Sequence, residues 1–173
     1  MSKENTLKIL TYPHPILKKK SIPIAQIDEN IKSLVKQMAT TMYENKGIGL
    51  AAPQIGQNIR LITVDISGPE KRENLLTLIN PQIIEKSGET ESEEGCLSVI
   101  GYRAKVKRAA KVKVVAQNLE ADRIEIEADD LLAICLQHEI DHLEGILFID
   151  RISRLKRNLY ERRLKKWLKQ SKK

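Results

Sequence analysis

The chain has 173 residues, of which 41% are hydrophobic and 31% are charged, and its formal net charge is +7. This composition predicts a single catalytic or binding domain over residues 1–173 and excludes an intrinsically disordered chain. No apolar run approaches the ~18 residues of a membrane span and the N-terminus lacks the apolar stretch of a signal peptide, so we expect a cytoplasmic protein that does not bind the membrane.

The N-terminal part of the chain predicts an extended segment, a helix and a loop. Residues 9–24 contain three prolines, each of which biases the preceding residue away from helix. Asp28 or Asn30 can cap a helix that runs to about Glu44, with apolar residues at spacings of three and four. Residues 47–56 hold three glycines and a proline, which predicts a loop that lets a ligand approach the backbone and presents the side chain of Gln54.

Four later segments predict strands because they are rich in Val, Leu and Ile: residues 58–66, 75–84, 102–117 and 123–127. Their hairpin-like spacing favours antiparallel pairing. Residues 131–145 predict a helix whose first half is apolar nearly all round and is therefore buried. We thus expect an α+β fold in which mostly antiparallel sheets pack around a central buried helix.

The central helix carries the sequence HEIDH at residues 138–142, a match to the H-E-x-x-H pattern. His138 and His142 are four residues apart, so they lie on one helix face with about 5–6 Å between Cβ atoms, which suits two imidazole ligands of one divalent metal. Glu139 is then placed to act as a general base on a water at the metal. The alternative is a chance match on a buried helix.

A tight metal site needs a third ligand, and the two cysteines are the candidates. Cys135 lies three residues before His138, but its short side chain leans toward the N-terminus of the helix, away from the ion. We interpret Cys135 as a residue of the pocket wall or core. Cys96 remains as the candidate third ligand, the alternative being a loop cysteine that only packs. Two imidazoles and one thiolate leave a fourth position open, which is typical of a catalytic metal site.

Three segments resemble the three signature motifs of the peptide deformylases, in order: GIGLAAPQ at 47–54, EGCLS at 94–98 and QHEIDH at 137–142. The resemblance extends over nearly the whole chain, because the proline-rich opening also resembles that family. It departs at Ile100, where many bacterial members have a proline. The resemblance implies hydrolysis of the formyl group from N-formylmethionine at the start of new polypeptides, with release of formate.

The resemblance also implies roles for individual residues. Cys96, His138 and His142 would hold the metal, and Glu139 would transfer the proton. The side-chain amide of Gln54 and the backbone N–H of Leu97 would stabilise the oxyanion. Glu94 is a candidate to orient a liganding histidine, the alternative being a solvated loop glutamate. The substrate would contact Ile48, Gly49, Arg103, Leu131, Ile134 and Cys135. The ligand types suit Fe(II), Zn(II), Ni(II) or Co(II), and the resemblance favours Fe(II) in the cell.

Residues 153–173 predict a basic amphipathic helix. Residues 151–173 hold 11 Lys and Arg against one acidic residue, a net charge of +10, whereas the rest of the chain carries −3. Two apolar stripes, 152/155/159 and 160/164/167/168, predict that the first half of this helix packs on the body and the second half on a partner. We expect the basic side chains to bind ribosomal RNA, the alternative being a helix that only caps the body, and we expect a monomer.

Two other functions are compatible with these residues. A general zinc peptidase would also use H-E-x-x-H, but its third ligand is typically His or Glu, and a blocked peptide without a formyl group would be its substrate. A non-enzymatic RNA-binding module would hold the metal only for structure and would tolerate Glu139→Gln. The low aromatic content of 3% argues against base stacking as its binding mode.

Overall fold

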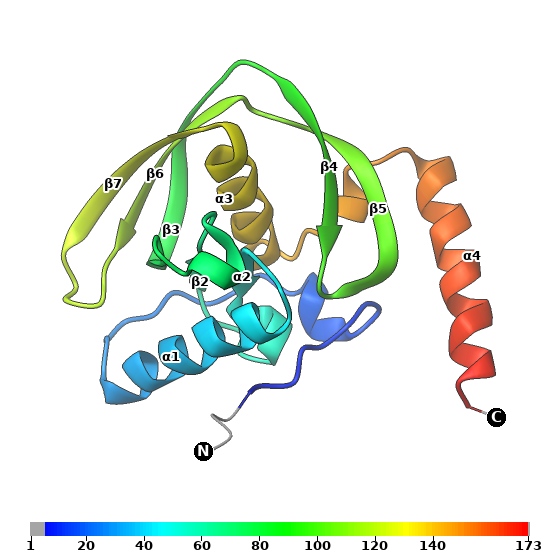
Figure 1. The fold of residues 1–173 in the computed structure, drawn as a ribbon, viewed down its shortest axis with the longest axis horizontal. Helices are drawn as coiled ribbons and strands as arrows, with labels where there is room; N and C mark the ends of the chain where they lie inside the picture. The colour runs from blue at the N-terminus through cyan, green and yellow to red at the C-terminus, as the bar shows by residue number, and fades with distance from the viewer. Residues whose placement is uncertain (1–5, 173) are drawn as a thin grey trace.

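The computed structural model describes residues 6–172 and has an α+β architecture (Figure 1). An antiparallel five-stranded sheet has the order β1-β2-β3-β6-β7 and is formed by β1 (Gly49–Ala51), β2 (Leu61–Val64), β3 (Leu76–Ser87), β6 (Lys111–Gln117) and β7 (Arg123–Asp129). A separate antiparallel hairpin is formed by β4 (Thr90–Cys96) and β5 (Val99–Arg108). Helix α3 (Asp130–Leu143), which carries the H-E-x-x-H segment, lies between the sheet and the hairpin. The predicted fold class is confirmed.

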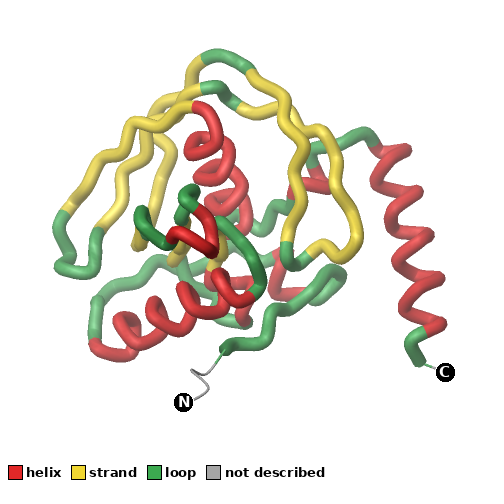
Figure 2. The backbone as a smooth tube through the Cα atoms, viewed as in Figure 1, coloured by secondary structure: helices red, strands yellow, loops and turns green. Residues whose placement is uncertain are grey.

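The remaining helices are α1 (Glu29–Glu44), α2 (Gly68–Lys71) and α4 (Arg154–Gln170), with short 3₁₀ helices at Pro15–Lys18, Ala52–Ile55 and Phe148–Asp150. Helix α1 begins where the sequence predicts, because the carboxylate of Asp28 accepts a hydrogen bond of 3.0 Å from the N–H of Ile31. The proline-rich segment before α1 is mostly loop and runs along the body (Figure 2). Its isolated bridge between Ile22 and Ile59 ties it to the chain just before β2.

Helix α3 is fixed by its apolar side chains, which face the five-stranded sheet. Ala133, Leu136, Ile140 and Leu143 belong to one buried cluster with strand residues such as Val114. Full burial of each large aliphatic side chain stabilises the fold by about 1.5–3 kcal/mol. The helix ends before Gly145, whose φ of 73° suits glycine and whose missing Cβ would lie 2.5 Å from the carbonyl oxygen of Lys18. The face that carries the histidines is therefore held in one orientation.

The region from Thr90 to Gln117 differs from the prediction in two respects. The expected strand 102–117 is two strands with a turn near Ala109, and Cys96 lies at the end of β4 rather than in a loop. The sequence of β4 is acidic and lacks β-branched alternation, so propensity alone does not identify it. Its acidic residues face basic residues of β5, with Glu93 opposite Lys105 and Glu91 opposite Lys107, and such opposite charges stabilise paired strands.

Helix α4 docks on the body through a different stripe from the one predicted. Leu155 and Leu159, expected to pack on the body, are 70% and 54% exposed, whereas Tyr160 and Leu164 are buried. The Tyr160 ring lies 4.7 Å from the ring of Tyr102 in β5. The prediction was wrong because a stripe of leucines on a basic helix does not by itself identify which face meets the body.

The first five residues and Lys173, which the predictions for the N-terminus and for the helix 153–173 included, lie outside the described residues. Within residues 6–172, every helix is too short or too polar to cross a bilayer.

Candidate active site

Three potential metal ligands converge between the hairpin and α3. The sulfur of Cys96, at the end of β4, and one nitrogen each from His138 and His142 all lie within 4.8 Å of one another. The Cys96 sulfur is 3.4 Å from Nε2 of His142. A thiolate and two imidazoles at these separations fit a single ion such as Zn(II) or Fe(II), since metal–ligand bonds are about 2.0–2.3 Å long.

A buried carboxylate orients one of the two histidines. Oε1 of Glu94 lies 2.8 Å from Nδ1 of His138, which leaves Nε2 of that ring for the ion. Burial raises the pKa of Glu94, but hydrogen bonds and charge from Arg108 and His138 outweigh this effect and lower it to about 2. Glu94 is therefore ionised at neutral pH and can accept a hydrogen bond from the Nδ1–H of His138.

Glu139 is buried beside the potential metal ligands, and its Oε2 has no hydrogen-bond partner among the described residues. Burial raises the pKa of Glu139 to about 7, against the charge of His138, which lowers it. A carboxyl group with a pKa near the working pH can both take and return a proton. Oε2 of Glu139 is therefore a hydrogen-bond acceptor that the described residues leave available to a bound molecule.

The amide of Gln54 is fixed by hydrogen bonds on both of its ends. Its Oε1 accepts a bond of 2.9 Å from the N–H of Ala51, and its Nε2 donates to Oγ of Ser98 at 3.1 Å. The same Nε2 lies 3.5 Å from the Cys96 sulfur. Because Gln54 is only 1% exposed, its donor group is held toward the ligand cluster without reorganisation.

A cavity of about 680 Å³ opens beside these groups. Its lining includes all the residues predicted to bind substrate together with most of the predicted catalytic and metal-binding residues: Ile48, Gly49, Gln54, Cys96, Leu97, Arg103, Leu131, Ile134, Cys135, His138 and Glu139. Only His142, which is buried, is absent from this lining. The Cys135 sulfur lies 3.8 Å from the carbonyl oxygen of Ile48, and burial raises its pKa, so it is a neutral thiol.

Three residues that contact the site have no role predicted from the sequence. Ser98 accepts the hydrogen bond from Gln54. Arg108 donates to Glu94, and Asp141 accepts from Arg108. In the β4–β5 hairpin Arg108 is opposite Thr90, and its side chain reaches Glu94 further along β4, a contact that local sequence patterns do not reveal.

The comparison with known families decides what this site belongs to. A family model described as polypeptide deformylase matches residues 6–158. The chain belongs to the polypeptide deformylase family. It is a hydrolase that removes the formyl group from the N-terminal methionine of new polypeptides.

Individual deformylases resemble the chain over almost their whole length. The peptide deformylase of Thermodesulfovibrio yellowstonii is 50% identical over 92% of this chain and 96% of its own. That of Desulfotalea psychrophila is 47% identical over 93% and 96%. The crystal structure of a peptide deformylase from Legionella pneumophila superposes with a TM-score of 0.90, at 43% identity over 98% of this chain and 99% of that one. The departure at Ile100 falls in β5, where the side chain is exposed, and leaves the neighbouring Cys96–Val99 pairing in place.

Proposed function

We propose that this deformylase holds one divalent ion with Cys96, His138 and His142, and that the ion is Fe(II) in the cell. The convergence of one sulfur and two imidazole nitrogens within 4.8 Å is the observation that carries the proposal. When bound, the ion supplies a Lewis acid that lowers the pKa of water toward neutrality. Zn(II), Ni(II) and Co(II) have compatible ligand preferences and are expected to load in vitro.

In this proposal Glu139 is the general acid and base. Its Oε2 accepts a proton from the attacking water and the carboxyl group then donates that proton to the leaving amine, so the same side chain acts in both steps. The pKa of about 7 supports both roles near neutral pH.

The developing oxyanion on the formyl group is stabilised by two donors, Nε2 of Gln54 and the backbone N–H of Leu97. Preorganised donors of this kind contribute about 3–4 kcal/mol each to the transition state. The hydrogen bonds that Gln54 makes with Ala51 and Ser98 support this role, because they fix the donor before the substrate arrives.

The cavity binds the methionine and the peptide that follows it. Ile48, Leu131, Ile134 and Cys135 supply apolar walls that suit an unbranched thioether side chain. The backbone of Gly49 in β1 pairs with the extended peptide, and Arg103 borders it from β5.

We further propose a monomer in the cytoplasm, in which residues 1–173 act as one catalytic domain with a basic C-terminal helix at 153–173 that binds ribosomal RNA. Exposed basic side chains along α4 support RNA binding, among them Arg162, Lys165, Lys166 and Lys169. Replacing these four with Gln keeps the buried Tyr160 and Leu164. Co-sedimentation with ribosomes should weaken, with a shallower dependence on salt; unchanged binding would remove this part of the proposal.

The decisive experiment measures formate release from formyl-Met-Ala-Ser by anaerobically purified protein, with metal content determined on the same sample. We expect turnover with about one metal per chain in the wild type. A blocked peptide without a formyl group, supplied at the same concentration, should not be cut. Turnover by metal-free protein would contradict the proposed mechanism.

A further inference from the structure

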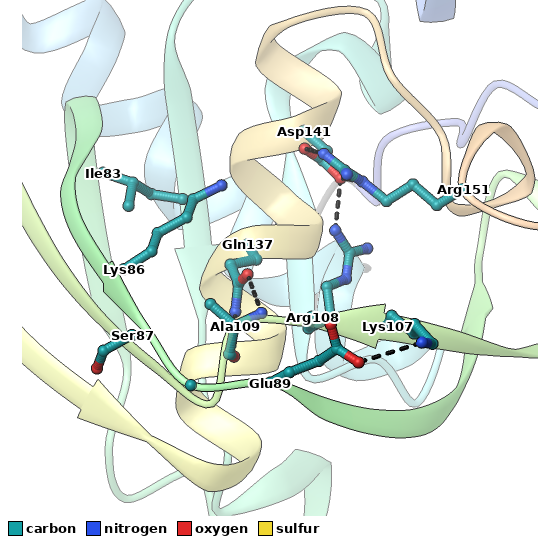
Figure 3. Close-up of a pocket in the computed structure, with 11 residues that line it drawn as sticks. Ile83, Lys86, Ser87, Glu89, Lys107, Arg108, Ala109, Gln137, Asp141 and Arg151 are labelled. Carbon is teal, nitrogen blue, oxygen red and sulfur yellow. Dashed lines mark hydrogen bonds and ion pairs between the residues drawn. The ribbon is translucent and has the colours of Figure 1, made fainter.

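Helix α3 carries a second pair of polar residues four apart, Gln137 and Asp141, each one position before a histidine. Gln137 makes two hydrogen bonds with the backbone of Ala109, accepting from its N–H at 3.0 Å and donating to its carbonyl at 2.9 Å. Asp141 accepts a hydrogen bond of 2.6 Å from Nη1 of Arg108 (Figure 3). The pair therefore fastens the end of β5 to the helix that carries the histidines.

Arg108 also contacts a proposed metal ligand indirectly, through Glu94. Its Nε and Nη2 donate to the two oxygens of Glu94 at 2.8 and 2.7 Å, and Glu94 in turn contacts Nδ1 of His138. The Arg108 side chain is only 2% exposed. One guanidinium thus joins β5, β4 and α3, the three elements that bring Cys96 to the two histidines.

The far end of this chain of contacts reaches solvent. Asp141 also accepts hydrogen bonds of 2.5 and 2.7 Å from Arg151, whose side chain is part-exposed. A second cavity of about 330 Å³ opens there, beside the face of α3 that carries Gln137 and Asp141, with Gln137, Arg108 and Arg151 in its wall (Figure 3). The charges of Arg108 and Arg151 balance those of Glu94 and Asp141. The buried cluster of these four side chains therefore needs no further counter-ion.

We propose that Arg108 is a positioning residue of deformylation, which holds the cysteine-bearing hairpin against the histidine-bearing helix and, through Glu94, holds the ring of His138. The inference rests on the ligand set proposed above. A guanidinium is suited to this task because its rigid fork reaches three carboxylate oxygens at once, whereas the single ammonium of lysine cannot. Mutation of residues that hold a metal ligand through hydrogen bonds typically costs about 10–100-fold in metal affinity or activity.

The test uses Arg108→Lys, which keeps the charge, and compares it with Arg60→Lys. Arg60 is also buried, but its partners are Glu144 and the carbonyl of Pro81. Both variants are loaded with Co(II), and the absorption spectrum, the rate of metal loss to a chelator, and kcat and KM of the loaded protein are measured. We expect Arg108→Lys to change the spectrum, lose metal roughly 10–100-fold faster and lower kcat with little change in KM. Arg60→Lys should leave the spectrum and the rate unchanged.

A double mutant separates positioning from general destabilisation. In a Glu94→Gln background, Arg108→Lys should add little to the rate of metal loss, because the link to His138 is already broken. If Arg108→Lys does not fold, the same measurements on Asp141→Asn decide the matter with the same expectation.

An unchanged spectrum and metal loss within twofold of wild type, in a folded Arg108→Lys protein, would overturn this inference alone. If the wild type itself shows no sulfur-to-cobalt charge-transfer band, the proposed ligand set is wrong and the inference falls with it.

Discussion

The carboxylate of Glu139 lies against the backbone of Gly49, so closely that a Cβ at position 49 would stand 2.4 Å from Oε1 of Glu139. Real Cβ atoms essentially never approach another atom so closely. Gly49 lies in β1 and Glu139 in α3, and the two elements pack together in the same core. The absence of a side chain in β1 is therefore what permits the proposed proton-transfer group to occupy its position.

We expect Gly49→Ala to displace Glu139 and to lower kcat by about 10²–10⁴-fold, the range that general acid–base catalysis contributes. The three atoms nearest the added methyl group all belong to Glu139 and none to a proposed metal ligand, so we expect the metal content to stay near one per chain. Combining Gly49→Ala with Glu139→Gln should cost little more than Glu139→Gln alone. Wild-type kcat in Gly49→Ala would show that Glu139 does not need its present position.

Glu139→Gln alone should keep the metal and the fold while it removes the proton transfer. We expect a loss of about 10²–10⁴-fold in kcat, measured as formate release, with unchanged metal content. The pH dependence of kcat/KM supplies the check. In the residual activity of Glu139→Gln, the change in kcat/KM that reports the titration of Glu139 should be absent. Retained turnover would leave the purely structural metal as the better account of this site.

Cys96→Ser should weaken metal binding by roughly a hundredfold or more, because a hydroxyl is a much poorer ligand than a thiolate. This loss exceeds the 10–100-fold that is typical when a residue hydrogen-bonded to a metal ligand is replaced. Competition with a chelator measures the affinity. Cys135→Ser is the matched control, since that sulfur faces the Ile48 carbonyl. Loss of metal in the control and retention in Cys96→Ser would reverse the assignment of the two cysteines.

Asp150 ties the start of α4 to the body, and its contribution should depend on pH. Burial raises its pKa, but Lys18, the N–H of Leu147 and Arg157 outweigh burial and lower it. A lowered folded-state pKa means that the stabilisation is full above the ordinary value of about 3.9 and is lost as the pH falls through the lower folded-state value. We expect Asp150→Asn to cost about 1–2 kcal/mol at pH 7.

Urea unfolding at several pH values tests this expectation. The difference between wild type and Asp150→Asn should shrink below pH ~4. Glu70→Gln, at an exposed position in α2, serves as the control and should show a small difference at every pH. A difference for Asp150→Asn that grows on acidification would contradict the assigned ion pairs.

How far the sequence predicts this molecule depends on whether the relevant contacts are local. The helix with HEIDH, its end before Gly145 and the cap at Asp28 follow from spacing and capping within a few residues. Strand β4 does not, because it is formed by pairing with β5 and its own residues lack the pattern of a strand. Arg108 likewise escaped prediction, since its partners Glu94 and Asp141 are distant in sequence. The prediction of the docking face of α4 was wrong for the same reason, because Tyr160 packs on Tyr102, which is distant in sequence.

The interleaving of Gln137 and Asp141 with the two histidines has a consequence for protein design. A designer who transplants the pentapeptide at 138–142 onto another scaffold moves the metal-facing side chains without the residues that hold them in position. The transferable unit begins one residue earlier, at Gln137, and includes an arginine on a neighbouring strand in reach of Asp141. A graft that lacks these parts is expected to bind metal loosely, however well its imidazoles are spaced.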